Sequence, residues 1–349
     1  MIEIDGSHGE GGGQILRTAL ALSAILNKPL KVHKIRAGRK NPGLQPQHLK
    51  AVEALARITQ ARTEGVRIGS ETIAFIPQET QPGDYRFEIG TAGSVTLLLQ
   101  ALLPPLCSVS GKTRLTLAGG THVEWSPPFH YLERIFFTIL RRMGITVNAD
   151  LERWGWYPRG GGIIHVEVHP ASEIKPLILT DRGKLMRIGG LSASSNLPAH
   201  VAERQRDYVL KEVGEKFNVD VDIEVDIHAQ ANSPGSFVFL TAESENIMAG
   251  SSSLGRKGKR AEDVAKEAVD SLKDYLSSEG CIDPHLADQL TLFMALARGT
   301  SSFTTTKITD HLLTNLWVIQ HFLDVEVRVS GELGGSGRIE ISNESKSLI

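Results

Sequence analysis

The chain has 349 residues, of which 41% are hydrophobic and 22% charged, a composition typical of a packed protein that excludes a disordered one. Its 38 lysines and arginines face 40 aspartates and glutamates, so the formal net charge is −2. This balance excludes a generally basic nucleic-acid coat, and a polyanion would have to be bound by a local basic cluster.

Glycine is enriched, with 34 residues, and its first cluster, 9–13, precedes a predicted helix. In that helix Ile15, Ala19, Leu22 and Leu26 fall on one face at helical spacing. The next predicted elements are a strand at 30–35, a helix from 46 to 58, and strands at 63–68 and 72–77.

A similar order of elements recurs twice. The second series follows the glycine segment 90–94, with a helix from 95, a strand at 113–117, a helix over 132–140, and strands at 145–150 and 163–168. The third follows Gly280, with a helix over 286–293, a strand at 302–306, a helix over 312–323, and strands at 325–329 and 337–341.

The spacing of equivalent residues shows where the third series is interrupted. His48 and His130 are 82 residues apart, whereas His130 and His311 are 181 apart, so roughly 100 extra residues lie within the third copy. The extra stretch, 184–278, has its own predicted strands at 185–193, 219–226 and 236–242, and helices at 198–216 and 261–276.

We therefore predict an α+β fold of three β-α-β-α-β-β units. Each unit places its helices on one face of a sheet, so that three units bury their helices together. The expected domains are a main domain of 1–183 and 279–349, and an inserted small α+β domain of 184–278. A single doubly wound sheet is the alternative.

The sequence also predicts where the protein resides. The first residues lack the basic and apolar regions of a signal peptide. The most apolar stretch, 95–109, is shorter than the roughly 20 residues that span a membrane, and it contains Pro104 and Pro105. Cys107 and Cys281 are too few for a disulfide framework or a cysteine zinc site, although a disulfide between them stays open. We expect a cytoplasmic protein without a membrane segment.

Standard nucleotide and hydrolase motifs are absent from the sequence. Residues 9–14 lack the last glycine of the dinucleotide fingerprint, and 255–260 lack the spacing and hydroxyl residue of a P-loop. Residues 334–338 have Arg338 where a nucleophile elbow needs glycine.

The glycine cluster that contains Glu10 is nevertheless a candidate phosphate site. Glycines before a helix let backbone N–H groups approach a phosphate, and the helix N-terminus favours negative charge. Glu10 would repel phosphate unless a divalent cation such as Mg²⁺ lay between them. The alternative is a glycine turn in which Glu10 only interacts with the helix dipole.

A basic loop follows the first helix. Arg36, Arg39 and Lys40 lie in a glycine-proline segment just before the next helix, with Arg17 upstream and Gln47-His48 downstream. Three cations close to a helix start are suited to holding phosphate groups. Solvated loop charges are the alternative.

Among the twelve histidines, His311 stands out by position. It follows Thr309-Asp310, where a helix N-cap is predicted, and the equivalent helices carry His48 and His130 at their starts. A helix N-terminus lowers the pKa of histidine, so the neutral, nucleophilic imidazole is favoured. A capping or packing role is the alternative.

Ten segments together identify a resemblance to a known family. They are 5–6, 9–17, 35–39, 42–44, 47–49, 83–87, 93–94, 157–162, 286–290 and 311–315. In these segments, and in their order along nearly the whole chain, the sequence resembles the RNA 3′-terminal phosphate cyclases.

The resemblance implies ATP-dependent conversion of an RNA 3′-phosphate into a 2′,3′-cyclic phosphodiester. It implies that His311 attacks the α-phosphorus of ATP, expels pyrophosphate and holds AMP covalently. AMP would then pass to the RNA 3′-phosphate, and the neighbouring 2′-OH would close the ring and release AMP. ATP is the expected co-substrate, Mg²⁺ or another divalent cation the expected metal, and RNA with a 3′-phosphate the expected partner. A homo-oligomer stays open.

The resemblance also implies roles for further residues. Glu10 would bind the metal. The groups expected at the phosphates or the RNA end are Arg17, Arg36, Arg39, Gln47 and His48. The residues expected around the adenosine are Gln100, Pro127, His285, Leu286, Ala287, Asp288 and Gln289.

Three other functions are the alternatives. A catalytically silent, cyclase-like RNA-binding factor for ribosome assembly would lack the nucleophile, so His311 argues against it. An enolpyruvyl-transferase-like enzyme would use similar units but gives no reason for His311. The basic segment 256–260 is either an RNA-binding loop or a solvated one.

Overall fold

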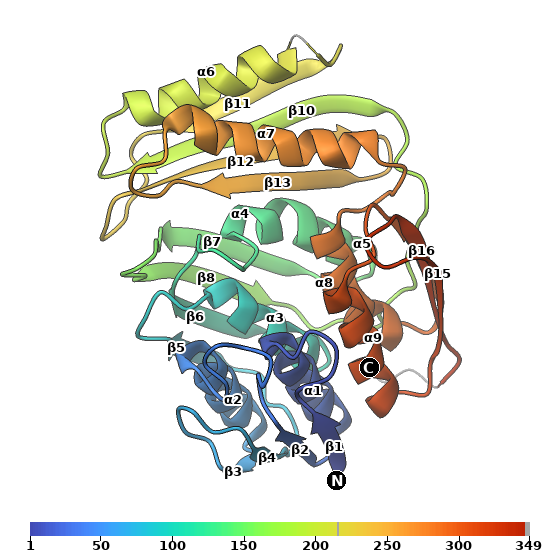
Figure 1. Cartoon of the computed structure of the whole chain (residues 1–349). Helices are drawn as coiled ribbons and strands as arrows, with labels where there is room; N and C mark the ends of the chain where they lie inside the picture. Colours follow the sequence, from blue (N-terminus) through green and yellow to red (C-terminus); the bar gives the residue numbers. More distant parts are fainter. Residues whose placement is uncertain (215, 346–349) are drawn as a thin grey trace.

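The structure is a computed structural model, and it describes residues 1–214 and 216–345 (Figure 1). These residues form four separate four-stranded sheets, so a single doubly wound sheet is excluded. In each sheet one outer pair of strands is parallel and the other two pairings are antiparallel.

The first sheet has the order β1-β2-β4-β3. Its elements are β1 (Ile2–Asp5), α1 (Gly13–Leu26), β2 (Leu30–His33), α2 (Pro46–Thr59), β3 (Arg62–Glu64) and β4 (Ile73–Ile76). The strand predicted at 63–68 ends early because the chain turns at Gly65, whose φ of +71° favours glycine.

The second sheet has the order β5-β6-β8-β7. Its elements are β5 (Asp84–Glu88), α3 (Val95–Cys107), β6 (Thr113–Gly119), α4 (Phe129–Tyr131), η1 (Leu132–Phe136), α5 (Phe137–Arg142), β7 (Val147–Arg153) and β8 (Gly162–Val168). The helix predicted over 132–140 is thus a continuous helical run that contains a π-helical turn, η1.

The third sheet has the order β15-β16-β14-β9. Its elements are β9 (Ile178–Leu179), α8 (Pro284–Leu296), β14 (Gly299–Thr305), α9 (Asp310–Phe322), β15 (Glu326–Gly331) and β16 (Gly337–Asn343). Between β9 and α8 the chain forms the fourth sheet, β11-β10-β12-β13. Its elements are β10 (Leu185–Ser195), α6 (His200–Gly214), β11 (Asp220–Asp226), β12 (Gly235–Ser244), β13 (Met248–Leu254) and α7 (Ala261–Ser277).

Four of these strands, β1, β5, β9 and β13, were not predicted. Strand β13 has the sequence MAGSSSL, which is poor in the β-branched and aromatic residues typical of strands. It forms because its backbone pairs along β12. Strand β9 has only two residues and depends on its pairing with β14.

Strand β12 separates two hydrophobic cores. Val238 and Leu240 face α6 and α7, whereas Phe237 and Phe239 face the core shared by the first three sheets. This alternation follows from the two-residue period of a strand. The fourth sheet therefore buries apolar side chains on both faces.

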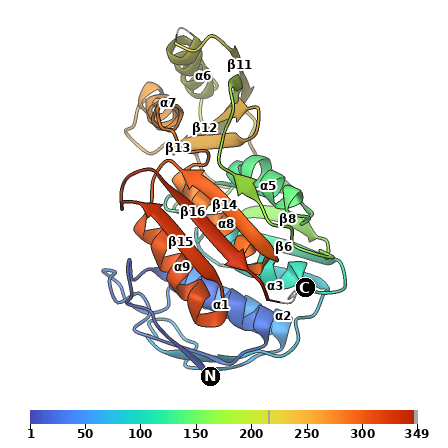
Figure 2. The ribbon, with the colours of Figure 1, turned by 90° about the vertical axis from the view of Figure 1, so that its right-hand side faces the viewer.

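Helix α1 lies at the centre of the larger core. It packs against α2, α3 and α9, and α8 packs against α9 and α3. Figure 2 shows α8 and α9 alongside the sheet of β14, β15 and β16, with α1 next to α9. As a result, the N-terminal end of α1 meets residues of α8 and α9. No helix in the described ranges is both long and apolar enough to cross a bilayer.

Candidate active site

His311 lies at the start of α9, one residue after the helix begins. Thr309 caps the helix, as predicted, and its side chain accepts a hydrogen bond of 3.1 Å from the Leu312 N–H. The imidazole is half exposed, with its Nδ1 against Gln14 Oε1 and its Nε2 2.5 Å from Glu10 Oε2. Burial lowers the pKa of His311, which favours its neutral form.

Gln14 connects His311 to the partly buried carboxylate of Asp288. The amide nitrogen Nε2 of Gln14 donates to Asp288 Oδ1, which leaves Gln14 Oε1 facing His311. Asn315 Nδ2 donates to the Asp288 backbone oxygen at 2.9 Å and itself accepts from Thr18 Oγ1 at 2.6 Å. Because Gln14 Oε1 can only accept, Nδ1 of His311 carries a proton, and the contact of Nε2 with the Glu10 carboxylate needs a proton on Nε2 as well. Nε2 has a free lone pair only when that second proton has left.

Asp288 also interacts electrostatically with Arg17, which was predicted to contact the phosphates or the RNA end. Burial raises the pKa of Asp288, an effect opposed first by the nearby His311. Burial also lowers the pKa of Arg17 to about 10, an effect opposed by Asp288, so Arg17 stays cationic at neutral pH. Gln14, which connects this pair to the imidazole, was not predicted as a site residue. The available signal was its position in the first turn of the helix behind the glycine cluster.

Glu10 sits in the glycine loop before α1. Its Oε1 contacts the Arg39 guanidinium and its Oε2 faces His311. Two glycines make this placement possible: a Cβ on Gly12 would lie 2.1 Å from Glu10 Oε1, and a Cβ on Gly9 would lie 2.2 Å from Thr314 Oγ1. Gly9 also has a φ of +54°, which disfavours other residues.

His48 lies close to Arg17 beside the first turn of α1. A Cβ on Gly13 would be 2.2 Å from His48 Nε2 and 3.1 Å from Arg17 Nη1, so glycine lets both side chains approach the helix N-terminus. His48 is buried, and burial, followed by the charges of Arg17 and Arg36, lowers its pKa to about 3. It is thus a neutral donor or acceptor at any physiological pH.

Arg36 and Gln47, which were predicted to contact the phosphates or the RNA end, form hydrogen bonds to the protein backbone. Arg36 adopts a φ of +56° and donates to the carbonyl oxygen of Gly43 at 3.2 Å. Gln47 Oε1 accepts from the Ser94 N–H at 3.2 Å. The Arg36 side chain thus stabilises the basic loop, and the Gln47 side chain stabilises the start of α3.

Of the seven residues predicted around the adenosine, Asp288 contacts Gln14 as described above, and the other six form three pairs. Leu286 and Ala287 have fully buried side chains in the core, because they lie on the inner face of α8. They offer a ligand no side-chain surface. In contrast, Gln100 Nε2 and Gln289 Oε1 are buried polar atoms without a hydrogen-bond partner among the described residues.

The last two residues predicted around the adenosine are His285 and Pro127. His285 is exposed in the first turn of α8, and Pro127 accepts a 2.7 Å hydrogen bond from Thr96 Oγ1 through its carbonyl. Buried amide groups are expected to have partners, so the unpaired atoms of Gln100 and Gln289 are suited to hydrogen bonds with a ligand.

His130, the counterpart of His48 and His311 in the second series, has a different environment. Its Nδ1 lies 2.9 Å from His122 Nε2, and both rings pack against Trp154. Burial lowers the pKa of His130 to about 3. The shared helix position thus gives a buried packing histidine in this series.

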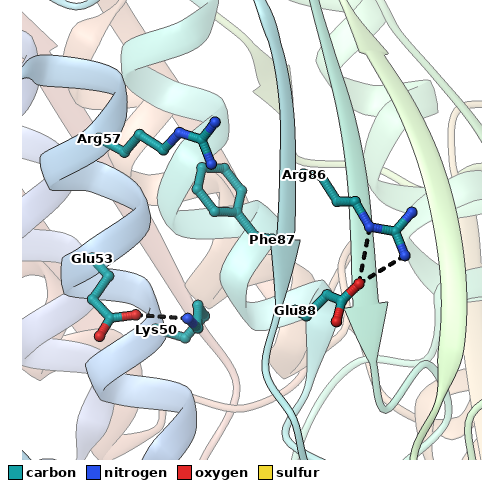
Figure 3. A pocket seen from close by; sticks show the side chains of 6 residues that line it. All are labelled: Lys50, Glu53, Arg57, Arg86, Phe87 and Glu88. Carbon is teal, nitrogen blue, oxygen red and sulfur yellow. Dashed lines mark hydrogen bonds and ion pairs between the residues drawn. The ribbon is translucent and has the colours of Figure 1, made fainter.

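Figure 3 shows a pocket of about 360 Å³ between α2 and β5. It is lined by Lys50, Glu53, Arg57, Arg86, Phe87 and Glu88. Lys50 pairs with Glu53 at 2.6 Å and Arg86 with Glu88 at 2.7 Å. The third cation, Arg57, lies over the Phe87 ring at 5.7 Å from its centroid. None of the predicted site residues lines this pocket.

Glu10 supplies the carboxylate that could hold a divalent cation at this site. The described residues contain no group of three or more His, Cys, Asp or Glu side chains that could hold a metal ion. Mg²⁺ commonly binds through one or two carboxylates and completes its shell with water and substrate phosphates. A single carboxylate beside arginines that are predicted to bind phosphate fits that mode of binding.

Comparisons with known proteins agree on one family. The family model described as RNA 3′-terminal phosphate cyclase matches residues 8–329. Proteins named RNA 3′-terminal phosphate cyclase from Thermococcus gammatolerans and Staphylothermus marinus are 42% and 44% identical, covering 99% and 98% of both chains. A solved enolpyruvyl transferase, NikO from Streptomyces tendae, aligns over 97% of this chain and 47% of its own at 12% identity, with a TM-score of 0.39 that supports no conclusion.

Proposed function

The chain belongs to the RNA 3′-terminal phosphate cyclase family, and we propose that it uses ATP to convert an RNA 3′-phosphate into a 2′,3′-cyclic phosphodiester. The observation that carries the mechanism is the orientation of His311. Its Nδ1 is occupied by Gln14, and its Nε2 points at the carboxylate of Glu10. When Glu10 takes the Nε2 proton and turns away, the imidazole, still held at Nδ1 by Gln14, presents one defined nucleophilic nitrogen.

In the first step, Nε2 of His311 attacks the α-phosphorus of ATP. A nitrogen–phosphorus bond forms while the bond to pyrophosphate breaks, so AMP is held as a phosphoramidate. The proton stays on Nδ1 and is donated to Gln14 Oε1, and Asp288 stabilises the positive charge that develops on the imidazole. Glu10 must move away from Nε2 before the attack, because its carboxylate occupies the side of the ring from which the α-phosphorus has to approach.

In the later steps, the RNA 3′-phosphate attacks the histidine-bound AMP and leaves His311 free. The adjacent 2′-OH then attacks the activated phosphorus and releases AMP. This last attack is favoured by proximity, because both groups belong to one ribose.

The phosphate groups of ATP and RNA carry charge that basic side chains must stabilise. Arg39 contacts Glu10, and the charges of Arg17 and Arg39 both act on His311; Arg17 is partly buried, which strengthens a hydrogen bond to phosphate. Glu10 would bind the divalent cation. When bound, such a cation neutralises phosphate charge and polarises the reacting phosphorus.

The adenosine is proposed to lie between α3 and the start of α8. The unpaired amides of Gln100 and Gln289 would bind its polar edge, with Pro127 and His285 against its faces. Leu286 and Ala287 support this surface from the core.

We also propose that residues 184–278 form an inserted domain on a main domain of 1–183 and 279–349. The fourth sheet and its two helices enclose a core of their own, which supports this division. A catalytically silent RNA-binding role is disfavoured by the presence and orientation of His311, and no observation favours an enolpyruvyl transferase.

The test is covalent labelling. Incubation with α-labelled ATP and Mg²⁺ should leave acid-labile, alkali-stable label on the protein, whereas γ-labelled ATP should leave none. His311→Ala should abolish the label, and the matched control His321→Ala, at the other end of α9, should retain it. An RNA 3′-phosphate should then be cyclised by the wild type only when ATP is present. Label that persists in His311→Ala would exclude this histidine as the nucleophile.

A further inference from the structure

A second pocket, of about 400 Å³, lies where the loop before α4 meets β12, β13 and the segment before α7. Pockets that bind small ligands are commonly about 300–1,000 Å³. Its apolar walls come from Val123, Pro128 and Phe237, and Ser252 adds an exposed hydroxyl. No residue predicted for the active site lines it.

Trp125 stands at this pocket almost wholly in solvent. Its side chain is 95% exposed, which makes it the most exposed of the large hydrophobic residues in the described chain. Its backbone has a φ of +64°, a conformation that bulky residues rarely adopt. Neither packing nor backbone preference explains a tryptophan at this position, so a ligand that stacks on its ring is the explanation we consider.

The opposite wall is formed by the basic segment 256–260, whose role the sequence left open. Arg256 lines the pocket and is exposed, with no acid at ion-pair distance in the part of the chain that the structure describes. Lys259 lines it as well, but is paired with Glu267. The unpaired carboxylate at the pocket is that of Glu124, which is exposed.

This combination matches a nucleotide within a strand better than a free anion. The two cations and two carboxylates that line the pocket cancel, so an isolated phosphate gains little there. A nucleobase can stack on Trp125 and donate its amino hydrogens to Glu124, while the backbone phosphate meets Arg256 at the rim.

The pocket is connected to the active site by a short series of hydrogen bonds. Gln47 accepts from the Ser94 N–H, and the Ser94 hydroxyl lies 2.7 Å from Thr96 Oγ1. Thr96 in turn donates to the carbonyl oxygen of Pro127, two residues after Trp125. The loop that carries Trp125 is therefore attached to the phosphate side of the proposed active site.

We propose that this pocket binds a nucleotide of the RNA substrate on the 5′ side of the reacting 3′-end, stacked on Trp125 with its phosphate on Arg256. The inference rests on the proposed function, because it names where the rest of the RNA strand lies once its end is at His311. It gives the fourth sheet and the basic segment before α7 a role in substrate binding.

The test compares a single-stranded oligoribonucleotide 3′-phosphate with a nucleoside 3′-monophosphate, which is too short to reach the pocket. Trp125→Ala should raise the KM for the oligonucleotide about tenfold, in line with the loss of one stacked base. It should leave unchanged the KM for ATP, the covalent labelling by α-labelled ATP and the turnover of the mononucleotide. Trp125→Phe, which keeps a ring, should restore most of the affinity.

Arg256→Ala should weaken oligonucleotide binding and reduce its salt dependence by a slope of about 0.7 on logarithmic axes, the value for one phosphate contact on a single strand. The matched control Arg298→Ala, an exposed arginine after α8, should change neither quantity. Equal losses on the long and the short substrate in Trp125→Ala would overturn the proposal, as would an unchanged KM for the oligonucleotide.

A binding measurement separates this inference from the proposed function. Titration with the oligonucleotide should quench the fluorescence of the wild type, and the quenching should be lost in Trp125→Phe. If the wild type takes no label from ATP, the proposed function fails, yet this titration still decides whether RNA occupies the pocket. Quenching that is unchanged in Trp125→Phe would refute the inference on its own.

Discussion

Replacement of Gln14 by leucine tests how His311 is prepared for attack. Leucine fills a similar volume but can neither accept from Nδ1 of His311 nor donate to Asp288. The imidazole then loses the partner that keeps the proton on Nδ1. Its Nε2 is protonated in part of the molecules, and in those it has no lone pair to offer to ATP.

The magnitude follows from the two hydrogen bonds that are lost. A hydrogen bond to a charged group contributes about 1.5–3 kcal/mol, and the bond from Gln14 to the partly buried Asp288 is of this kind. Together with the weaker bond to His311, the barrier should rise by about 2–4 kcal/mol, which slows adenylylation about 30- to 1,000-fold.

The assay is the single-turnover transfer of label from α-labelled ATP to the protein. Gln320→Leu, an exposed glutamine near the end of α9, is the matched control and should react at the wild-type rate. Asp288→Asn should slow the same step. Because Asp288 acts on His311 through Gln14, the double variant should be little slower than the slower single variant.

Two results would refute this reasoning. A rate in Gln14→Leu within about twofold of the wild type would show that the imidazole needs no partner at Nδ1. Strictly additive losses in the double variant would show that Asp288 and Gln14 act independently.

The remaining predictions concern the metal, the pH dependence of stability and one buried contact. Glu10→Ala should lower metal-dependent turnover and leave the thermal unfolding curve intact; unchanged turnover at low Mg²⁺ would remove its metal role. The pKa values of His48 and His130 are lowered to about 3, so below about pH 6.5 the unfolded chain binds protons that the folded chain does not. As the pH is lowered from about 6.5 towards 3, the free energy of unfolding should therefore fall by up to about 1.4 kcal/mol per pH unit for each histidine. Urea titrations of His130→Phe should show a shallower fall than those of the wild type. Tyr131→Phe removes the buried donor at 2.8 Å from Asp283, the cap of α8, and urea unfolding should show a loss of about 1–3 kcal/mol; an unchanged midpoint would show that the contact is not stabilising.

The elements that the sequence predicted are those with a strong local signal. Helices α1, α2 and α9 follow from apolar residues at helical spacing, and the cap of α9 from Thr309. Strands β9 and β13 carry no such signal. Strand β9 is stabilised by pairing with β14, which is distant in the sequence, and β13 by pairing with β12, which has the stronger pattern. Local pattern is therefore informative where a segment's own side chains decide its conformation.

The candidate site shows the same division. Resemblance to a family pointed to His311 and Glu10, and both prove to face each other although 301 residues separate them. The role of Gln14 emerged only from the packing of α1 against α9, which brings it into contact with His311 and Asp288. No spacing within the chain encodes that contact.

The sequence by itself thus determined the helices, the glycine loops and the chemical character of the site, because these depend on neighbouring residues. The tertiary structure decided which side chains are available for chemistry. It buried Leu286 and Ala287 in the core, paired His130 with His122, and left Trp125 in solvent beside the basic segment. The physical reason is that burial and partnership arise from contacts between distant segments, which exist only once the helices of the separate sheets have packed together.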